Sequence, residues 1–450
     1  MRVASKQITI KAITVSILIT SIFSVTTHSK YSFVLLFNNT TFRWGVYAMI
    51  VTSFIFATAY FYDKKNNLNM IVVLLYILWN TICIIRGALV AEIYWDWKEL
   101  IENTMILTLV IVAYAATNIL LTQSLLAFYF KYVIPLFPIF ALVVNTDAWG
   151  FYLMGASLML LFIPVLTKRQ NILLFSIILV IMLSDLGARS NVIKFAIPIV
   201  FLVLYYLKDV ISKSLIELAR VLLFVIPIVL FILGVSGIFN VFKMDEYIKK
   251  DMTTVGVDYD GERKEVSLTD DTRTFLYEEV LQSAKRNNYW LFGRTPARGN
   301  DSLTFGLWEF EWTGRYERAK NEIGLANVYT WTGLVGVLLY LFLFYHISYV
   351  AVNKSNNSFS KMLGLYVAFR WMFSWIEDYQ NFTLNFLLLW IMIGMAASES
   401  FRKMSDEEVT LWARGVFDSR YVRLQNIFIK KSLYEKSKDS STVDMSQQKK

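Results

Sequence analysis

The chain has few of the residues that build disulfides and metal sites. Among its 450 residues there are one cysteine, Cys83, and two histidines, His28 and His346. A lone cysteine excludes an intramolecular disulfide, and three such side chains are too few for a typical zinc or iron site. We therefore expect no metal ion and no other cofactor.

Charged residues are also scarce, at 18% of the chain, whereas hydrophobic residues make up 56% and the mean hydropathy is +0.48. Soluble domains carry about 25% charged residues. The composition therefore predicts an all-α polytopic membrane protein. The net charge of +9 does not indicate nucleic acid as a partner, because the lysines and arginines concentrate in short loops and in the tail.

About twelve apolar segments are long enough to cross a bilayer as helices. Nine of them lie in residues 1–240 and three in residues 325–398, and the long polar loop 241–324 separates the two groups. The segments cover residues 9–27, 44–62, 68–90, 101–121, 124–144, 148–166, 171–186, 190–207, 218–240, 325–350, 361–378 and 382–398.

The positions of lysine and arginine predict the orientation of the helices. Basic residues such as Lys64 and Lys168 fall in alternate short loops, and positive charge marks the cytoplasmic side. An even number of helices then places both termini in the cytoplasm and the loop 241–324 outside it. The basic cytoplasmic tail, residues 399–450, ends in a polar stretch that we expect to be partly disordered.

The long loop contains one pattern typical of a helix. A Thr-Asp-Asp sequence ending at Asp271 precedes an amphipathic stretch that runs to Asn287, and we expect this helix to lie on the membrane surface. Recurring glycines predict an irregular segment over residues 291–324. Aromatic residues such as Trp290 and Trp312 either stack on sugars or anchor the loop at the membrane surface.

Basic residues inside apolar segments are candidate functional residues, because a charge at the bilayer centre costs roughly 2.5–3.5 kcal/mol. Arg86 and Lys194 lie near outer ends of helices, where they either serve the site or simply reach the interface. Arg189 opens a helix at its outer end, where free backbone N–H groups and a guanidinium would suit a diphosphate. Arg370 lies mid-segment and either binds substrate or pairs with a nearby carboxylate.

The long loop carries two arginine pairs. Arg294 and Arg298 lie four residues apart between glycines, and Arg315 and Arg318 follow. A guanidinium binds phosphate oxygens through two hydrogen bonds, so the pairs would hold two phosphates, or a diphosphate and a sugar. A charged surface loop also produces such pairs by chance, and the sequence leaves both explanations open.

Two carboxylates are candidates for chemistry. Glu322 stands where the loop returns to the membrane, five residues before Asn327, and Asp301 lies beside the first arginine pair. Glu322 either acts as a general base or caps the next helix near its positive end.

Two stretches resemble the superfamily of O-antigen polymerases and O-antigen ligases, which are glycosyltransferases of the bacterial envelope. Gly-Ala-Arg-Ser at 187–190 is similar to the family's small-residue-Arg-Ser signature at an outer helix start. Trp-Leu-Phe-Gly-Arg at 290–294 is similar to its glycine turn, and Asn-Glu-Ile-Gly-Leu at 321–325 leads into Thr-Gly-Leu-Val-Gly at 332–336 as in its late helix. Ligases and many polymerases of the family carry a His-Asn pair near that point, and the absence of a histidine here makes a ligase the less favoured of the two.

The resemblance implies a GT-C-like architecture and metal-independent, inverting glycosyl transfer. The substrates would be undecaprenyl-diphosphate-linked oligosaccharides at the outer face of the bacterial cytoplasmic membrane, and the product O-antigen or capsular polysaccharide. A chain-length regulator and a flippase would be partners. Glu322 would be the base, with Asp301 as second choice. The substrate-binding residues would be Arg189, Arg294, Arg298, Arg315, Arg318, Arg370 and Asn327.

Two other functions fit the sequence less well. A ligase would transfer finished polymer to a lipid or protein acceptor. A lipid-linked oligosaccharide flippase would also have about twelve helices, but the long loop and the absence of an internal repeat argue against a transporter.

The predicted orientation is open to a direct test. A reporter enzyme that is active only outside the cytoplasm should be active when fused after Val257 and inactive when fused after Lys213 or Ser405, because basic loops stay inside. Reporter activity in cells expressing each fusion checks this. Activity of the Lys213 fusion would invert the map.

Overall fold

A computed structural model describes residues 2–26, 28–29, 39–184, 189–247, 253–257, 263–267, 271 and 273–424 of the chain. Gly187 and Ala188 of the first resembling stretch, Asp270 of the expected helix cap and residues 425–450 of the tail lie outside this part. The backbone of Arg189 is described, but its side chain is not.

Within the described residues, seven helices are long and apolar enough to cross a membrane. The chain is therefore a helical membrane protein, as its composition predicts, and the total of about twelve crossings stays a prediction. The seven cover Ser5–Thr26, Thr40–Phe61, Lys64–Val90, Tyr94–Ala116, Ile119–Val143, Lys213–Val235 and Gly324–Asn353, and two shorter apolar helices cover Val192–Tyr206 and Leu384–Ala397.

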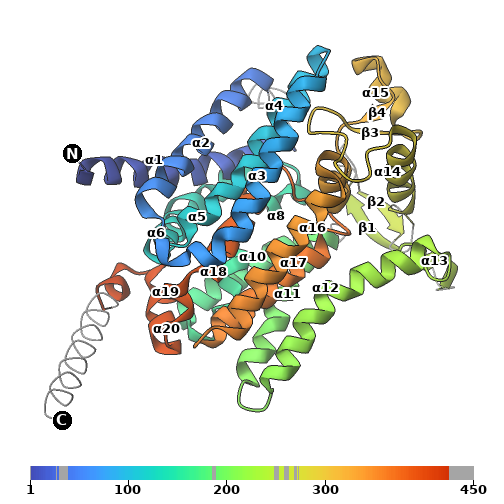
Figure 1. Ribbon diagram of the computed structural model, residues 1–450. Coiled ribbons are helices and arrows are strands. Elements are labelled where there is room, and N and C mark those ends of the chain that lie inside the picture. The colour runs from blue at the N-terminus through green and yellow to red at the C-terminus, as the bar shows by residue number, and fades with distance from the viewer. Residues whose placement is uncertain are drawn as a thin grey trace, which may run out of the picture.

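The helices of the bundle carry the labels of Figure 1. Their bounds are α1 Arg2–Thr26, α2 Thr40–Phe61, α3 Asn67–Val90, α4 Tyr94–Thr108, α5 Val112–Ala116, α6 Ile119–Phe128, α7 Phe137–Val143, α8 Trp149–Tyr152, α9 Gly155–Leu160, α10 Lys168–Ser184, α11 Arg189–Tyr206, α12 Lys213–Val235, α16 Gly324–Asn353, α17 Ser358–Phe373, α18 Leu384–Ala397, α19 Glu399–Arg402 and α20 Asp406–Gly415.

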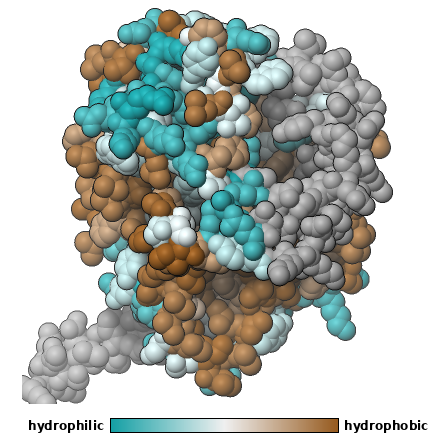
Figure 2. Space-filling model, turned by 90° about the vertical axis from the view of Figure 1, so that its right-hand side faces the viewer, coloured by the Kyte–Doolittle hydropathy of each residue, from teal (hydrophilic) through white to brown (hydrophobic). Residues whose placement is uncertain are grey.

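The centre of the bundle is formed by α16, α17 and α18, with α3 against α16 and α5 against α18 (Figure 1). Every residue of α18 is buried, as expected for a helix that is apolar on all sides. Helix α12 lies at the periphery. On the face shown in Figure 2, hydrophilic residues gather in the upper part and hydrophobic residues cover the lower part, which is the pattern of a protein partly embedded in lipid.

The segment expected as one helix over residues 148–166 is broken into short helical pieces, so that prediction is wrong. Gly155 lies so close to the ring of Tyr129 that a Cβ there would be 2.4 Å from it. The hydroxyl of Tyr129 donates to the carbonyl of Tyr152 at 2.8 Å, and the hydroxyl of Tyr152 donates to that of Val133 at 2.9 Å. Tyrosine hydroxyls thus donate hydrogen bonds to backbone carbonyls in a buried region, where such groups need partners within the protein.

The described residues of the loop region form two small antiparallel sheets and three helices. The expected irregular segment after residue 291 is therefore wrong in part, since it contains α15 and the pair β3 and β4. The bounds are α13 Met244–Tyr247, β1 Thr253–Val257, β2 Arg263–Ser267, α14 Thr274–Asn287, β3 Asn300–Asp301, α15 Gly306–Thr313 and β4 Glu317–Arg318, with β1 paired to β2 and β3 to β4.

Helix α14 is the amphipathic helix that the sequence predicts, and it ends at Asn287 as expected. The carboxylate of Asp271 accepts from the N–H groups of residues 273 and 274 and so caps its start. Its apolar side chains Leu276 and Val280 pack against Ile323 and Ala326 at the start of α16. Its apolar face thus covers the start of α16, and its place on the membrane surface stays a prediction.

Helix α16 is broken at Gly333, where the backbone has φ +68° and ψ −170°. The loop at residues 290–294 fills the break. The N–H of Leu334 donates to the carbonyl of Trp290 at 2.9 Å, and the N–H of Arg294 donates to the carbonyl of Thr330 at 2.7 Å. The loop therefore makes hydrogen bonds that an unbroken helix would have made internally.

Arg86 holds the same loop from the other side. Its guanidinium donates to the carbonyls of Phe292 and Gly293, and lies 5.9 Å from the centroid of the Phe292 ring. The expectation that Arg86 merely reaches the interface is wrong. The positive charge of Arg86 stabilises carbonyl groups of a loop that lies more than 200 positions later in the sequence.

Gly293 and Gly333 cross with no space for a side chain. A Cβ on Gly293 would lie 2.5 Å from the backbone nitrogen of Gly333, and the φ of Gly293 is +71°. We expect Gly293→Ala to cost more than about 3 kcal/mol, or to abolish accumulation, because neither backbone can give way. Thermal unfolding of the detergent-purified protein measures the loss.

Gly314→Ala is the matched control for this prediction. Gly314 has φ +72°, but no atom lies within 4 Å of the position that a Cβ would take there. Its alanine variant should lose only the roughly 1–2 kcal/mol of a left-handed backbone. Equal losses in the two variants would show that the crossing is not tight.

Candidate functional site

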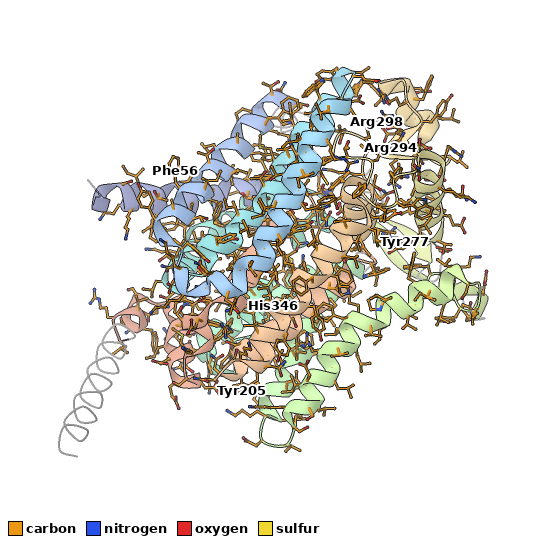
Figure 3. All side chains as sticks on the ribbon, in the orientation of Figure 1. Phe56, Tyr205, Tyr277, Arg294, Arg298 and His346 are labelled. Carbon is orange, nitrogen blue, oxygen red and sulfur yellow. The ribbon has the colours of Figure 1, made fainter. Side chains whose placement is uncertain are left out.

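Arginines and carboxylates gather at the end of the bundle that carries the long loop. Figure 3 shows Arg294 and Arg298 there, at the opposite end from Tyr205. The arginines and carboxylates of this end form separate groups, and each is held by elements of the loop or by the outer ends of helices.

The first group joins Arg294 and Arg298 to the two strands of the β3 and β4 pair. Arg294 contacts Asp301 at 2.8 Å and Glu317 at 2.7 Å through its two terminal nitrogens. Two nitrogens of Arg298 donate hydrogen bonds to the carboxylate of the same Glu317. Two cations thus face two carboxylates, all partly buried, and a phosphate would bind here only by displacing a carboxylate.

The second group joins Arg273 and Arg318 to Glu322. One oxygen of Glu322 lies 2.7 Å from Arg273, and the other lies 3.3 Å from Arg318. The Glu322 side chain is 54% exposed, whereas Arg318 is largely buried against the ring of Phe305. Here two guanidiniums contact one exposed carboxylate.

Arg273 was missed by the sequence analysis. It lies two residues after the capping residue Asp271, and that position was the only available signal. Its guanidinium also donates to the carbonyl of Ile376, beyond the end of α17, at 3.1 Å. The contact brings together residues more than 100 positions apart, which local patterns do not reveal.

Glu322 does not cap α16, so that alternative is wrong. The N–H groups of Gly324 and Leu325 donate instead to the carbonyls of Glu377 and Ser374. Asn327 is buried, and its amide exchanges two hydrogen bonds with the backbone of Asn321, at 2.7 and 2.9 Å. Asn327 therefore fixes the turn that presents Glu322.

Arg315 and Arg370 lie outside these two groups, and the side chain of Arg189 is not among the described parts of the chain. Arg315 contacts Asp96 at 3.0 Å and Glu92 at 3.2 Å, and so ties the loop to the turn between α3 and α4. Arg189 begins α11. Arg370 lies inside the bundle.

Arg370 is fully buried in the last turn of α17. It donates to the side-chain oxygen of Asn385 at 2.8 Å and lies over the ring of Tyr379, while its Nε and the second terminal nitrogen have no hydrogen-bond partner. The expected pairing with a carboxylate is not seen: Glu377 lies 3.4 Å from Lys194 instead. Lys194 is itself buried, which rules out simple exposure at the interface.

A cavity of about 790 Å³ adjoins the first group. Arg86, Arg294 and Arg298 line it together with Trp290 and Phe292, both of which are partly exposed. Aromatic faces beside hydrogen-bond donors are the usual lining of a site for a polar ring such as a sugar.

Asp301 and Asp378, two partly buried carboxyl groups of this end, differ in acidity. Burial alone would raise the pKa of Asp301, but hydrogen bonds from Arg294 and Asn287 lower it. Burial raises the pKa of Asp378 to about 6, although Lys320 acts in the opposite direction. Asp378 lies in the turn between α17 and α18, where it accepts a hydrogen bond from the N–H of Gln380 at 2.8 Å.

This difference bears on which group takes up a proton. A low pKa makes Asp301 a weak base, whereas a carboxyl that titrates near neutral pH is suited to proton transfer. The sequence placed Asp378 in an outer turn but did not single it out, because its burial depends on the packing of distant helices.

Comparison of the chain with protein-family models, with curated proteins and with solved structures finds no match. In the part of the chain that the structure describes, no group of three or more histidine, cysteine, aspartate or glutamate side chains is placed to hold a metal ion.

The raised pKa of Asp378 predicts how stability depends on pH. The folded protein binds this proton more tightly than the unfolded chain, so stability from this group falls as pH rises from about 4 to 6. Asp378→Asn imitates the neutral acid. It should be more stable than the wild type by about 1–3 kcal/mol at pH 7.5, and the difference should shrink toward pH 4.

Asp301→Asn is the control with the opposite sign. Its carboxylate is stabilised when ionised, so this variant should be less stable than the wild type at pH 7.5. Melting temperatures between pH 4 and pH 8 measure both. A destabilised Asp378→Asn protein with an unchanged pH profile would contradict the assignment.

Proposed function

We propose that the chain is a polymerase that joins undecaprenyl-diphosphate-linked oligosaccharide units into O-antigen or capsular polysaccharide at the outer face of the bacterial cytoplasmic membrane. The observation that carries the proposal is the group of Arg273, Glu322 and Arg318. It places two cations and an exposed carboxylate together at the point where the loop returns to the bundle. That combination suits transfer of a sugar from a diphosphate, which needs cations for the leaving group and an acceptor for a proton.

The arginines bind the leaving group. A diphosphate carries more charge than one carboxylate, so it competes with Glu322 for Arg273 and Arg318. Among the carboxylates paired with loop arginines, only Glu92 is more exposed than Glu322. Exposure makes Glu322 easy to displace. Binding of substrate thereby releases Glu322 from its ion pairs.

The released carboxylate then accepts a proton. In the transfer step, a sugar hydroxyl of one unit attacks the anomeric carbon of the other, and its proton passes to Glu322. The new C–O bond forms as the bond from the anomeric carbon to the diphosphate oxygen breaks, with inversion at that carbon. The diphosphate leaves with the electron pair, and the arginines stabilise its charge.

The remaining expected residues take supporting roles. Arg294 and Arg298 face the cavity that would hold sugar rings, and Asp301 with Glu317 keeps them in place. Asp378 is a second candidate for the base. A flippase would supply the units, and a chain-length regulator would set the number that are joined.

The function is tested by deleting the gene and examining the surface polysaccharide. A polymerase deletion should leave surface lipid with at most one repeat unit, so the ladder of longer chains disappears. Loss of a ligase would instead leave full-length polymer on the carrier lipid, and loss of a flippase would leave single units on the cytoplasmic side. Restoring the gene with Glu322→Gln should restore the protein without the ladder, because the amide is a poor base.

Glu311→Gln, on exposed α15, is the matched control and should restore the ladder. A ladder in the deletion strain, in the absence of a second polymerase, contradicts the function. A ladder in the Glu322→Gln strain contradicts only the role of Glu322.

A further inference from the structure

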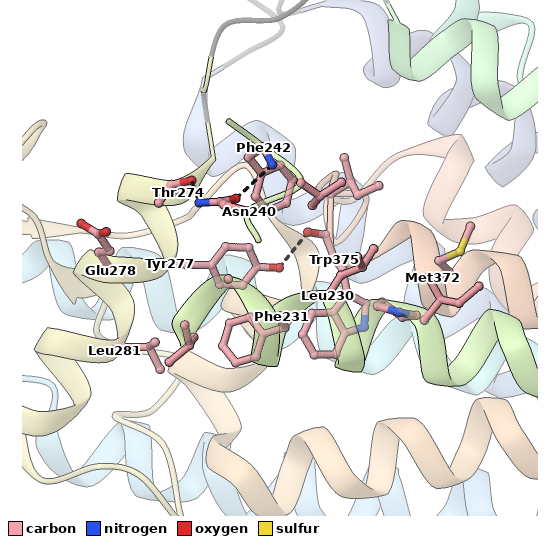
Figure 4. Close-up of a pocket in the computed structure, with 16 residues that line it drawn as sticks. Leu230, Phe231, Asn240, Phe242, Thr274, Tyr277, Glu278, Leu281, Met372 and Trp375 are labelled. Carbon is pink, nitrogen blue, oxygen red and sulfur yellow. Dashed lines mark hydrogen bonds between the residues drawn. The ribbon is translucent and has the colours of Figure 1, made fainter. Parts of the chain in front are cut away.

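An apolar cavity of about 460 Å³ lies between α12, α14 and the end of α17. Figure 4 shows side chains from all three elements directed into it. Its walls include Pro227, Leu230, Phe231, Leu281, Met372 and Trp375. The volume lies within the roughly 300–1,000 Å³ of small-molecule sites, and the lining suits a hydrocarbon.

The polar groups in the wall are already bonded to one another. The amide of Asn240 donates to the hydroxyl of Thr274 at 2.8 Å and accepts from the N–H of Phe242 at 3.0 Å. The hydroxyl of Tyr277 donates to the carbonyl of Trp375 at 2.7 Å. Figure 4 shows these bonds at the edge of the cavity, with the carboxylate of Glu278 directed away from the apolar side chains.

The cavity borders the part of the surface that faces lipid. Helix α12 lies at the periphery of the bundle (Figure 1), and only 17% of its spanning segment is buried within the protein. Val229, Ile232 and Val235 on this helix are exposed. A ligand would therefore enter from the bilayer rather than from water.

One end of the cavity meets the arginine group of the proposed active site. Ile376 lines the cavity, and its carbonyl accepts a hydrogen bond from the Nε of Arg273. Thr274, also in the lining, follows Arg273 in the chain. A molecule with a hydrocarbon chain in the cavity would thus present its polar end to Arg273 and Glu322.

We propose that this cavity holds the first part of the polyprenyl chain of the lipid carrier, with the diphosphate at Arg273 and Arg318. The assignment rests on the proposed function, which supplies a lipid diphosphate as substrate. Charge complementarity supports it, because the guanidiniums of Arg273 and Arg318 lie at the end of the cavity and bind phosphate oxygens well. The cavity fixes the chain, and thereby the position of the diphosphate beside Glu322.

Photo-crosslinking tests the assignment on the full-length protein in lipid nanodiscs. The probe is a polyprenyl monophosphate with a diazirine on an isoprene unit near the phosphate. It should label peptides of α12 and α14. In Gly234→Phe, labelling should fall by about tenfold or more, because the new ring would take the space of roughly two methylene groups of the probe. Gly234 lines the cavity, and a Cβ there meets only the carbonyl of Phe239, at 3.9 Å, so a side chain can start from this position without a backbone clash.

Gly45→Phe on α2 is the matched control, because no atom lies within 4 Å of the position that a Cβ would take at Gly45, and this residue lies outside the cavity. Its labelling should stay at the wild-type level. Leu230→Trp fills the cavity from another position and should reproduce the loss. Unchanged labelling in the two cavity variants overturns the proposal.

Competition identifies the occupant. Unlabelled polyprenyl diphosphate should compete with the probe, and dioleoyl phosphatidic acid should not. Equal competition by the two lipids would show a general lipid site and overturn the assignment of the chain. Crosslinking does not depend on polymer synthesis, so correct labelling combined with a ladder in the deletion strain would leave the cavity assigned and refute the polymerase.

Discussion

The crossing of Gly293 and Gly333 is the contact on which the outer half of the molecule depends. It breaks α16 within the bundle, and the loop at residues 290–294 makes the hydrogen bonds that the break leaves open. Unbonded backbone groups are costly where water is excluded, so loop and helix must fold together. Arg86 adds a third element by binding the carbonyls of Phe292 and Gly293.

This junction fixes the geometry of the charged groups around it. Arg294 follows the crossing directly, and from there it reaches Asp301 and Glu317 on the β3 and β4 pair. Helix α14 packs on the start of α16 through Leu276 and Val280, which brings Arg273 beside Glu322. The carboxylates hold the arginines in position, and the most accessible carboxylate of the two groups, Glu322, is also the proposed base.

The sequence predicted the parts of this arrangement that depend on local patterns. Hydropathy predicted a helical membrane protein, in whose described residues seven helices are long and apolar enough to span a membrane, and the end of α14 at Asn287 followed from its amphipathic period. The contacts of Arg86 and Arg273 were missed because each joins residues at least 100 positions apart. Likewise, the break at Gly333 lies within an apolar stretch that reads as one continuous helix, and only the loop that fills it reveals why glycine is needed there.

Polymerisation by the purified protein is the most direct test of the account. The protein in lipid nanodiscs is incubated with a lipid-diphosphate-linked repeat unit and a metal chelator, and the lipid-linked products are separated by size. The account predicts products that grow by whole repeat units, with one carrier diphosphate released for each unit added. Bound substrate that is never elongated, or elongation that requires a metal ion, would contradict it.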